Sequence, residues 1–131
     1  MPLAVDTNVL VRALVDDGTE QTQRAVRRFM SEDTFVSVTV LLETEWVLRS
    51  KVGLDEKAVN RLFAALAGYE HVEFEDRARI LKAIAAHGQG LDFADALHLF
   101  AASECRGLCS FDADFRRRAK RLDGAIPVMA P

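Results

Sequence analysis

Four segments of the sequence carry acidic residues inside or directly beside apolar stretches. Asp6 follows "PLAV", Glu43 and Glu45 lie within "VTVLLETEWVL", Asp92 and Asp95 within "GLDFADALHLFAA", and Asp112 and Asp114 follow "LCSF". A carboxylate in apolar surroundings is unfavourable unless it is paired, hydrogen-bonded or bound to a metal ion. Oxygen ligands suit Mg²⁺ and Mn²⁺, and two such ions about 4 Å apart can activate a water molecule against a phosphodiester. The four segments together indicate a metal-dependent hydrolase.

Several of these acids also have a purely structural interpretation. Asp92 and Asp95 can be the N-cap and the third residue of a helix, where carboxylates accept hydrogen bonds from backbone N–H groups and interact favourably with the helix dipole. Asp112 can cap the basic helix that follows it, and Asp114 can interact with the dipole of the same helix. For these residues the capping and the metal-binding interpretations both stay open.

Glu43 and Glu45 are two positions apart in a segment with helical character. On a helix two such side chains point about 200° apart, so only one of them can face the core. Glu43 has Val40, Trp46 and Val47 as its neighbours three or four positions away. We therefore predict that Glu43 lies on the apolar face and needs a functional reason to be there.

Other reactive residue types give weaker signals. His98, three residues after Asp95, can be a metal ligand or proton carrier, or a histidine at the edge of the core. The three histidines are too far apart in sequence for a zinc set, and Cys105 and Cys109 do not form a CxxC motif, which favours two reduced thiols. The sequence contains no P-loop, no GxGxxG and no GxSxG, which disfavours a nucleotide-binding motif of these types and a serine hydrolase.

The elements that must position the acids alternate along the chain. We predict strands over 3–5 (buried), 34–38, 71–74, 108–111 and 126–129, and helices over 9–15, 20–30, 39–51, 55–67, 76–87, 92–106 and 114–122. This alternation predicts an α/β fold with a mainly parallel sheet and helices on both faces. Ligands in such folds bind beyond the carboxyl ends of the strands, which is where Asp6 and Asp112 lie.

Length and composition are those of an ordinary globular protein. The chain has 131 residues, a formal net charge of −3 and 50% hydrophobic residues, which predicts one domain over 1–131. No apolar stretch approaches the roughly 18 residues needed to span a bilayer, and the N-terminus does not resemble a signal peptide. We therefore expect a cytoplasmic protein with no membrane partner.

The four acidic segments resemble a known family. "VDTNVLVRAL", "VSVTVLLETEWVLRS", "FADALHLFAA" and "SFDADFRR" are similar, in this order and over nearly the whole chain, to the four acidic motifs of PIN-domain nucleases. Within that family they look most like the VapC toxins of prokaryotic type II toxin–antitoxin pairs. The resemblance implies a three-layer α/β/α PIN-like fold. It also implies roles for residues that match the motifs: metal ligands and catalytic acids at Asp6, Glu43, Asp95 and Asp112, a further optional ligand at Asp114, and supporting hydrogen bonds from Thr7, Asn8 and Ser110.

The resemblance further implies an activity and partners. The expected activity is endonucleolytic cleavage of RNA with Mg²⁺ or Mn²⁺, in which an activated water attacks phosphorus directly. The expected partners are a cognate antitoxin and a second copy of the chain, as a homodimer or a dimer-based complex. We expect the antitoxin to lay an apolar stretch along the early helices and the Asp55–Gly68 segment, with its neighbour Tyr69, where Phe63 and Leu66 add apolar surface. We also expect it to insert an arginine near Asp6 and Asp95. A housekeeping RNA-processing PIN nuclease and a non-catalytic partner-binding scaffold remain alternatives, whereas an aspartyl phosphatase would need an acid where Asn8 stands.

The charge is unevenly distributed. Without the five acids of the motifs (Asp6, Glu43, Asp95, Asp112 and Asp114), 15 of the 20 acidic residues remain against 17 Lys and Arg, a balance of +2. Basic residues cluster at Arg24, Arg27 and Arg28 and in "RRRAKR". From the second cluster, Arg116, Arg117, Arg118 and Arg121 are candidates for contacts with the RNA backbone, with a solvated helix face as the alternative.

Overall fold

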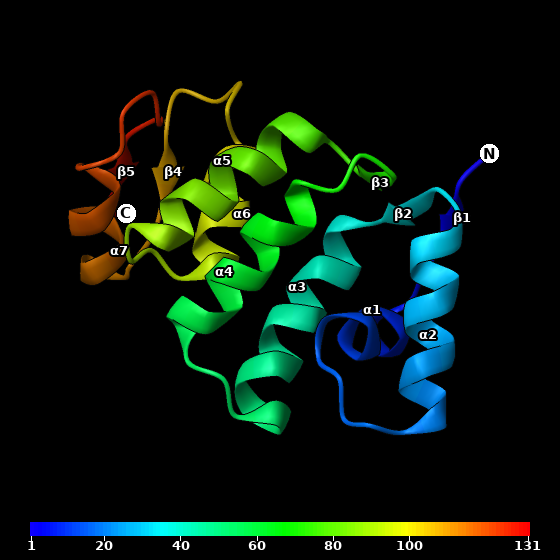
Figure 1. Cartoon of the computed structure of the whole chain (residues 1–131). Helices are drawn as coiled ribbons and strands as arrows, with labels where there is room; N and C mark the ends of the chain where they lie inside the picture. The colour runs from blue at the N-terminus through cyan, green and yellow to red at the C-terminus, as the bar shows by residue number, and fades with distance from the viewer. The chain divides into compact units, whose positions relative to one another are not determined.

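The computed structural model describes residues 1–131 and contains two compact units, Met1–Arg77 and Ala78–Pro131 (Figure 1). All strand pairs in both units are parallel, and helices separate consecutive strands. The α/β class with parallel strands is therefore as predicted. No helix is both long enough and apolar enough to cross a bilayer.

The first unit contains a three-stranded parallel sheet in the order β1-β2-β3, with Leu3 opposite Thr34 and Thr34 opposite Val72. Its elements are β1 (Leu3–Ala4), α1 (Thr7–Leu14), α2 (Glu20–Ser31), β2 (Thr34–Val36), α3 (Val38–Val47), the π-helical turn η1 (Leu48–Val52), α4 (Glu56–Ala67) and β3 (Val72–Phe74). Gly53 ends η1 with a φ of 88°, which a glycine adopts without strain. The predicted order of strands and helices is confirmed here.

Helix starts in this unit follow from side chains that can accept a backbone hydrogen bond. Asp6, Thr19, Ser37 and Asp55 each precede a helix and accept an N–H from the residue three positions later. Such a cap satisfies one of the N–H groups that the first turn leaves without a partner, and is worth about 1 kcal/mol.

Two predictions of burial in the first unit are wrong. Leu3 and Ala4 of β1 are exposed, and only Val5 is buried, because β1 is an edge strand of its sheet. Phe63 and Leu66 are 0% exposed, because they share the inner face of α4 with Val59, so they offer no surface to an antitoxin. Tyr69 alone of the three predicted residues is exposed.

The second unit contains the parallel pair β4–β5, with Leu108 opposite Val128. Its elements are α5 (Arg77–Gly88), α6 (Phe93–Ala101), β4 (Leu108–Cys109), α7 (Ala113–Ala119) and β5 (Val128–Met129). Helix α6 ends five residues earlier than predicted. The N–H of Ala102 bonds to the carbonyl of Leu99, and this shorter-range bond tightens and ends the last turn. Cys105 and Cys109 are exposed, and no disulfide joins them.

Candidate active site

Asp6 lies between the end of β1 and the start of α1, and is exposed to solvent. Its Oδ1 accepts a hydrogen bond of 3.0 Å from the N–H of Val9. The same carboxylate thus caps α1 and presents Oδ2, which accepts no hydrogen bond within the chain. The strand end therefore delivers a carboxylate in a fixed orientation with one free oxygen.

Glu43 comes from the middle of α3 and lies next to the start of α1. The hydroxyl of Thr7 donates a short hydrogen bond to Oε1 of Glu43. A cavity of about 540 Å³, here called the acid pocket, is lined by Asp6, Thr7, Asn8, Val11, Val40, Glu43 and Val47. The first unit thus brings four of the predicted site residues (Asp6, Thr7, Asn8 and Glu43) to one cavity whose other walls are valines.

The prediction that Glu43 occupies the apolar face of its helix is wrong. Glu43 is exposed, whereas the side chain of Glu45 is buried, with the residue 3% exposed. Both carboxylate oxygens of Glu45 accept hydrogen bonds from Arg49, at 3.1 Å from Nη2 and at a shorter distance from Nε. Apolar residues surround α3 on all sides, so neighbours three or four positions away do not define its inner face. The signal that sequence reasoning missed is Arg49, which stands one turn after Glu45 and allows a carboxylate to be buried.

In the second unit, Asp92 and Asp112 are helix N-caps. Oδ2 of Asp92 accepts the N–H of Asp95 at 3.2 Å at the start of α6, as the capping interpretation predicted. Oδ1 of Asp112 accepts the N–H groups of Asp114 and Phe115 at 3.0 and 3.1 Å at the start of α7. Oδ2 of Asp112 accepts no hydrogen bond within the chain. Asp112 therefore resembles Asp6: one oxygen fixes a helix start and the other is free.

Asp95 lies in the first turn of α6 and is partly buried. Burial raises the pKa of this carboxyl group, and the negative charges of Asp92, Asp112 and Asp114 raise it further, while His98 acts in the opposite direction. The acids of this unit therefore lie close enough to repel one another. A divalent cation would relieve this repulsion, and hard carboxylate oxygens are the donors that Mg²⁺ and Mn²⁺ prefer.

The residues around Asp112 are connected by hydrogen bonds and ion pairs. Ser110 Oγ accepts the N–H of Asp112 at 3.1 Å, and the Ser110 carbonyl accepts a hydrogen bond of 2.8 Å from Arg116 Nη1. Asp114 pairs with Arg117 and, at 2.8 Å, with Arg118 Nε, and these hydrogen bonds and charges lower its pKa.

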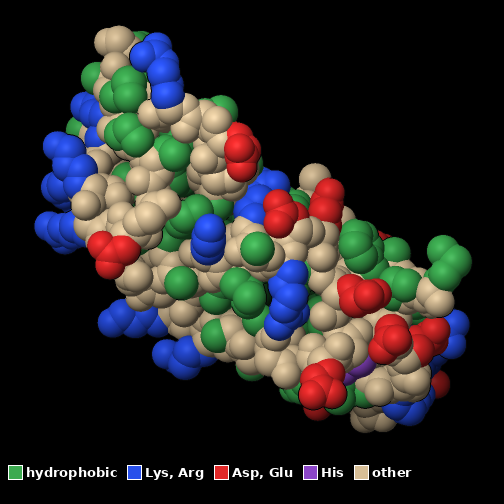
Figure 2. Space-filling model, turned by 90° about the horizontal axis from the view of Figure 1, so that it is seen from above, with side chains coloured by type: hydrophobic (Ala, Val, Ile, Leu, Met, Phe, Trp, Pro, Cys, Tyr) green, Lys and Arg blue, Asp and Glu red, His purple; other side chains and the backbone are tan.

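Three of the four predicted RNA-contact arginines thus have a partner within the chain, and Arg121 is exposed. Figure 2 shows Lys and Arg side chains as well as Asp and Glu side chains at the surface of the face that it draws. His98 is exposed on α6 and is not a core residue.

No group of three or more His, Cys, Asp or Glu side chains within either unit is positioned to enclose a metal ion. Of the predicted ligands and their acidic neighbours, Asp6 and Glu43 lie in the first unit, and the second unit contains Asp92, Asp95, Asp112 and Asp114. A Mg²⁺ ion usually keeps several of its water molecules and is held through one or two carboxylates together with substrate phosphate oxygens. Carboxylates with one fixed and one free oxygen fit this mode of binding.

A comparison with models of known protein families gives a match. A family model described as PIN domain matches residues 3–121, which include every element from β1 to α7. The parallel strands and the helices fit the three-layer α/β/α fold of that family. The searches of curated proteins and of solved structures gave no match. PIN domains are, as a family, divalent-metal-dependent nucleases that act on RNA. Since the match extends over most of the sequence, this chain belongs to the PIN domain family.

Proposed function

We propose that this chain, as one domain over residues 1–131, is a Mg²⁺- or Mn²⁺-dependent endoribonuclease whose metal ligands are Asp6, Glu43, Asp95 and Asp112. The observation that carries the proposal is that the segment matched by the PIN family model has an acid in each of its four motifs. The environment of Asp95 supports it: burial raises the pKa of this carboxyl group most, and the nearby negative charges of Asp92, Asp112 and Asp114 raise it further, and a bound cation would offset those charges.

When bound, the divalent ions supply an activated water molecule and stabilise negative charge on the phosphate. The residues of the chain hold the ligands in place for this chemistry. The N–H of Val9 fixes Asp6, the hydroxyl of Thr7 fixes Glu43, and the first turn of α7 fixes Asp112. Hydrogen bonds of this kind typically change metal affinity or activity by about 10- to 100-fold.

The biological role that we propose is that of a VapC-type toxin. It would act in the cytoplasm, dimerise, and be held inactive by a cognate antitoxin. The support for this finer assignment is the resemblance of the four motifs. A housekeeping RNA-processing nuclease would use the same residues, and a short open reading frame beside the gene would distinguish the toxin from it. A non-catalytic scaffold would bind its partner without any metal-dependent cleavage.

The decisive experiment incubates the purified protein with defined tRNAs and rRNA fragments in Mg²⁺, in Mn²⁺ and in a chelator. We expect cleavage only with a metal ion, and none from Asp6→Asn or Asp112→Asn. Asn is as good an N-cap as Asp, so both variants should keep their helix starts. Asp55→Asn is the matched control, because Asp55 is also an exposed N-cap but lies outside the four motifs. Undiminished cleavage in chelator, or by Asp6→Asn, would refute the proposal.

A further inference from the structure

Helices α1 and α2 line a second cavity in the first unit, of about 710 Å³. Four arginines line it, namely Arg12, Arg24, Arg27 and Arg28, and we call it the arginine groove. None of its remaining lining residues is acidic; these are Asn8, Val9, Gln21, Ala25 and Ser31. A concave surface with four guanidinium groups and no carboxylate attracts anions.

The arginines of the groove differ in how far they are engaged within the chain. Arg24 and Arg27 are exposed and have no carboxylate partner, and Arg28 has an exposed ion pair of 3.3 Å with Glu32. Such an exposed pair contributes little and is readily exchanged for another anion. Arg24 and Arg28 are one helical turn apart, about 6 Å along the axis of α2.

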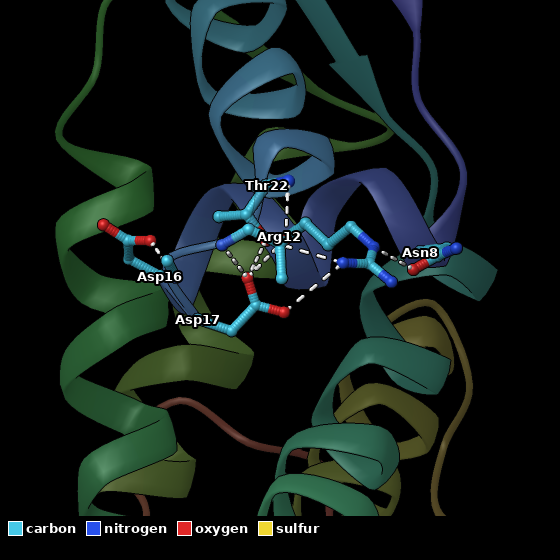
Figure 3. Close-up of polar contacts among 7 residues, drawn as sticks. Asn8, Arg12, Asp16, Asp17 and Thr22 are labelled. Atoms are coloured by element: carbon cyan, nitrogen blue, oxygen red, sulfur yellow. Dashed lines mark hydrogen bonds and ion pairs between the residues drawn. The ribbon is translucent and has the colours of Figure 1, made fainter.

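Arg12 is held in place instead. Its Nε donates to Oδ1 of Asn8 at 3.1 Å, and its Nη1 contacts Asp17 at 3.4 Å and Thr22 at 3.5 Å (Figure 3). Its Nη2 donates no hydrogen bond within the chain. The guanidinium group therefore has a fixed orientation and an available donor at the wall of the groove.

The arginine groove and the acid pocket have one lining residue in common. Asn8 lines both cavities, and it lies two residues after Asp6 in the same helix start. The two cavities are therefore neighbours at Asn8, close enough for a polymer bound at Asp6 to reach the groove as well. The polymer that the proposed function brings to Asp6 is RNA, which carries one phosphate per nucleotide.

We propose that the arginine groove binds the backbone phosphates of the RNA substrate beside the bond that is cleaved. The inference rests on the proposed function. Arg24 and Arg27 each contact a phosphate, and Arg12 supplies a fixed third contact nearest to the acid pocket. Because phosphate contacts carry no sequence information, the groove sets affinity and register and does not select the cleavage site.

The test measures RNA binding in a chelator, so that cleavage does not interfere. A fluorescein-labelled single-stranded oligoribonucleotide is titrated with the full chain at salt concentrations from about 50 to about 200 mM. The variant Arg24→Ala/Arg27→Ala is compared with Lys57→Ala/Arg61→Ala. The control pair also removes two exposed positive charges from the first unit, but on α4 and outside the groove.

For a single strand, each lost phosphate contact makes the negative slope of log K against log salt shallower by about 0.7. The groove variant loses two contacts, so its slope should be shallower than that of the wild type by about 1.4. We also expect its Kd to rise by about tenfold at about 100 mM salt, and its KM for cleavage to rise with kcat retained. The control variant should keep the wild-type slope. Equal slopes for the groove variant and the wild type would overturn the proposal, whatever the cleavage assay shows.

The alternative occupant is an acidic protein segment, and a Glu-rich peptide serves as its probe. If Arg24→Ala/Arg27→Ala weakened binding of this peptide but left RNA binding unchanged, the groove would be a protein-binding site and the proposal would be wrong.

The experiment distinguishes failure of the proposed phosphate binding in the groove from failure of the proposed nuclease function. Metal-dependent cleavage with an unchanged KM in the groove variant refutes the groove alone. A slope that depends on Arg24 and Arg27, without cleavage by the wild type, refutes the nuclease alone.

Discussion

The hydroxyl of Thr7 donates a hydrogen bond to the carboxylate of Glu43, although the two residues are 36 positions apart in the sequence. The bond joins the first residue of α1 to the middle of α3, and so joins the first two acidic segments of the sequence. It orients Glu43 through Oε1 and leaves Oε2 free.

Replacing this hydroxyl should therefore affect metal binding more than stability. Thr7→Val has the same shape but no hydrogen-bond donor. We expect it to lower the apparent affinity for Mg²⁺, measured through cleavage, by about 10- to 100-fold. Thr7→Ser keeps the hydroxyl and is the control. The measurement is the cleavage rate across a Mg²⁺ series at constant ionic strength. Identical Mg²⁺ curves for Thr7→Val and the wild type would show that the bond has no such role.

The burial of Asp95, together with the negative charges of Asp92, Asp112 and Asp114, should lower the stability of the folded chain in the absence of metal. A carboxyl group whose pKa is raised on folding destabilises the folded state where it is ionised, and this penalty is relieved as the pH falls through its folded pKa. Asp95→Asn should therefore raise the Tm in chelator at neutral pH, and the gain should disappear in acid. Thermal unfolding followed by circular dichroism tests this, with Asp55→Asn as the control. A lower Tm for Asp95→Asn at neutral pH would show that neither burial nor like-charge repulsion makes the ionised Asp95 unfavourable.

Substitution of Glu45 should affect the stability of the chain, whereas substitution of Glu43 should affect cleavage. Glu45→Gln removes the buried charge that pairs with Arg49, and we expect the free energy of unfolding to fall by about 2 kcal/mol. The expected cost is below the usual range for a broken buried ion pair because the side chain of Arg49 is 33% exposed. Glu43→Gln should unfold at nearly the wild-type urea concentration and yet lose cleavage. If both variants were equally destabilised, the distinction between the two glutamates would fail.

Asp17 should make the connection between α1 and α2 sensitive to acid. Side-chain hydrogen bonds from Thr22 and Thr19 and the charge of Arg12 lower the pKa of Asp17 to about 2 (Figure 3). A depressed carboxyl pKa contributes stability above the unfolded value, near 3.8, that is lost as the pH falls toward the folded value. Asp17→Asn should therefore be less stable than the wild type near pH 5, roughly one unit above the ordinary pKa. The difference in stability should shrink as the pH falls toward about 2, the folded pKa of Asp17. Urea unfolding at several pH values measures it, and a difference that stays constant with pH would argue against this contribution.

Asp92 should be required for the start of α6 and not for cleavage. Asp92→Ala removes the acceptor for the N–H of Asp95 and should lower the free energy of unfolding by about 1 kcal/mol, with little loss of activity per folded molecule. Asp92→Asn keeps a capping oxygen and should be close to the wild type in stability. Chemical denaturation and active-fraction measurements test the two variants together. A large loss of activity in Asp92→Asn would instead make Asp92 part of the metal site.

The sequence predicts the elements well where a local signal exists. Asp55 and Gly53 define the start of α4 and the end of η1, because a cap acceptor and a residue tolerant of positive φ act within a few residues. Burial is predicted less well. The exposure of Leu3 follows from the edge position of β1, and the burial of Phe63 follows from the direction in which α4 faces, and both depend on distant parts of the chain.

In the candidate site too, features with a local sequence signal are predicted, and features that depend on distant parts of the chain are not. The motifs locate Asp6, Glu43, Asp95 and Asp112 along the chain, but no pattern in the sequence shows which carboxylate oxygen is committed to a hydrogen bond. The pairing of Thr7 with Glu43 is a tertiary contact, and so is the position of Asn8 between the two cavities. The exchange of roles between Glu43 and Glu45 was missed because a helix that is apolar on all sides gives no periodic signal.

The two exposed thiols affect how the proposed dimer has to be measured. Cys105 and Cys109 lie four positions apart at the surface, and neither is in a disulfide. Accessible thiols on separate copies can be oxidised to an intermolecular disulfide during storage in air. A cross-linked pair of chains formed in this way has the mass of a biological dimer on a sizing column. Only association that survives a reducing agent, or that persists in a variant with both thiols replaced by serine, counts as evidence for a dimer held by complementary surfaces.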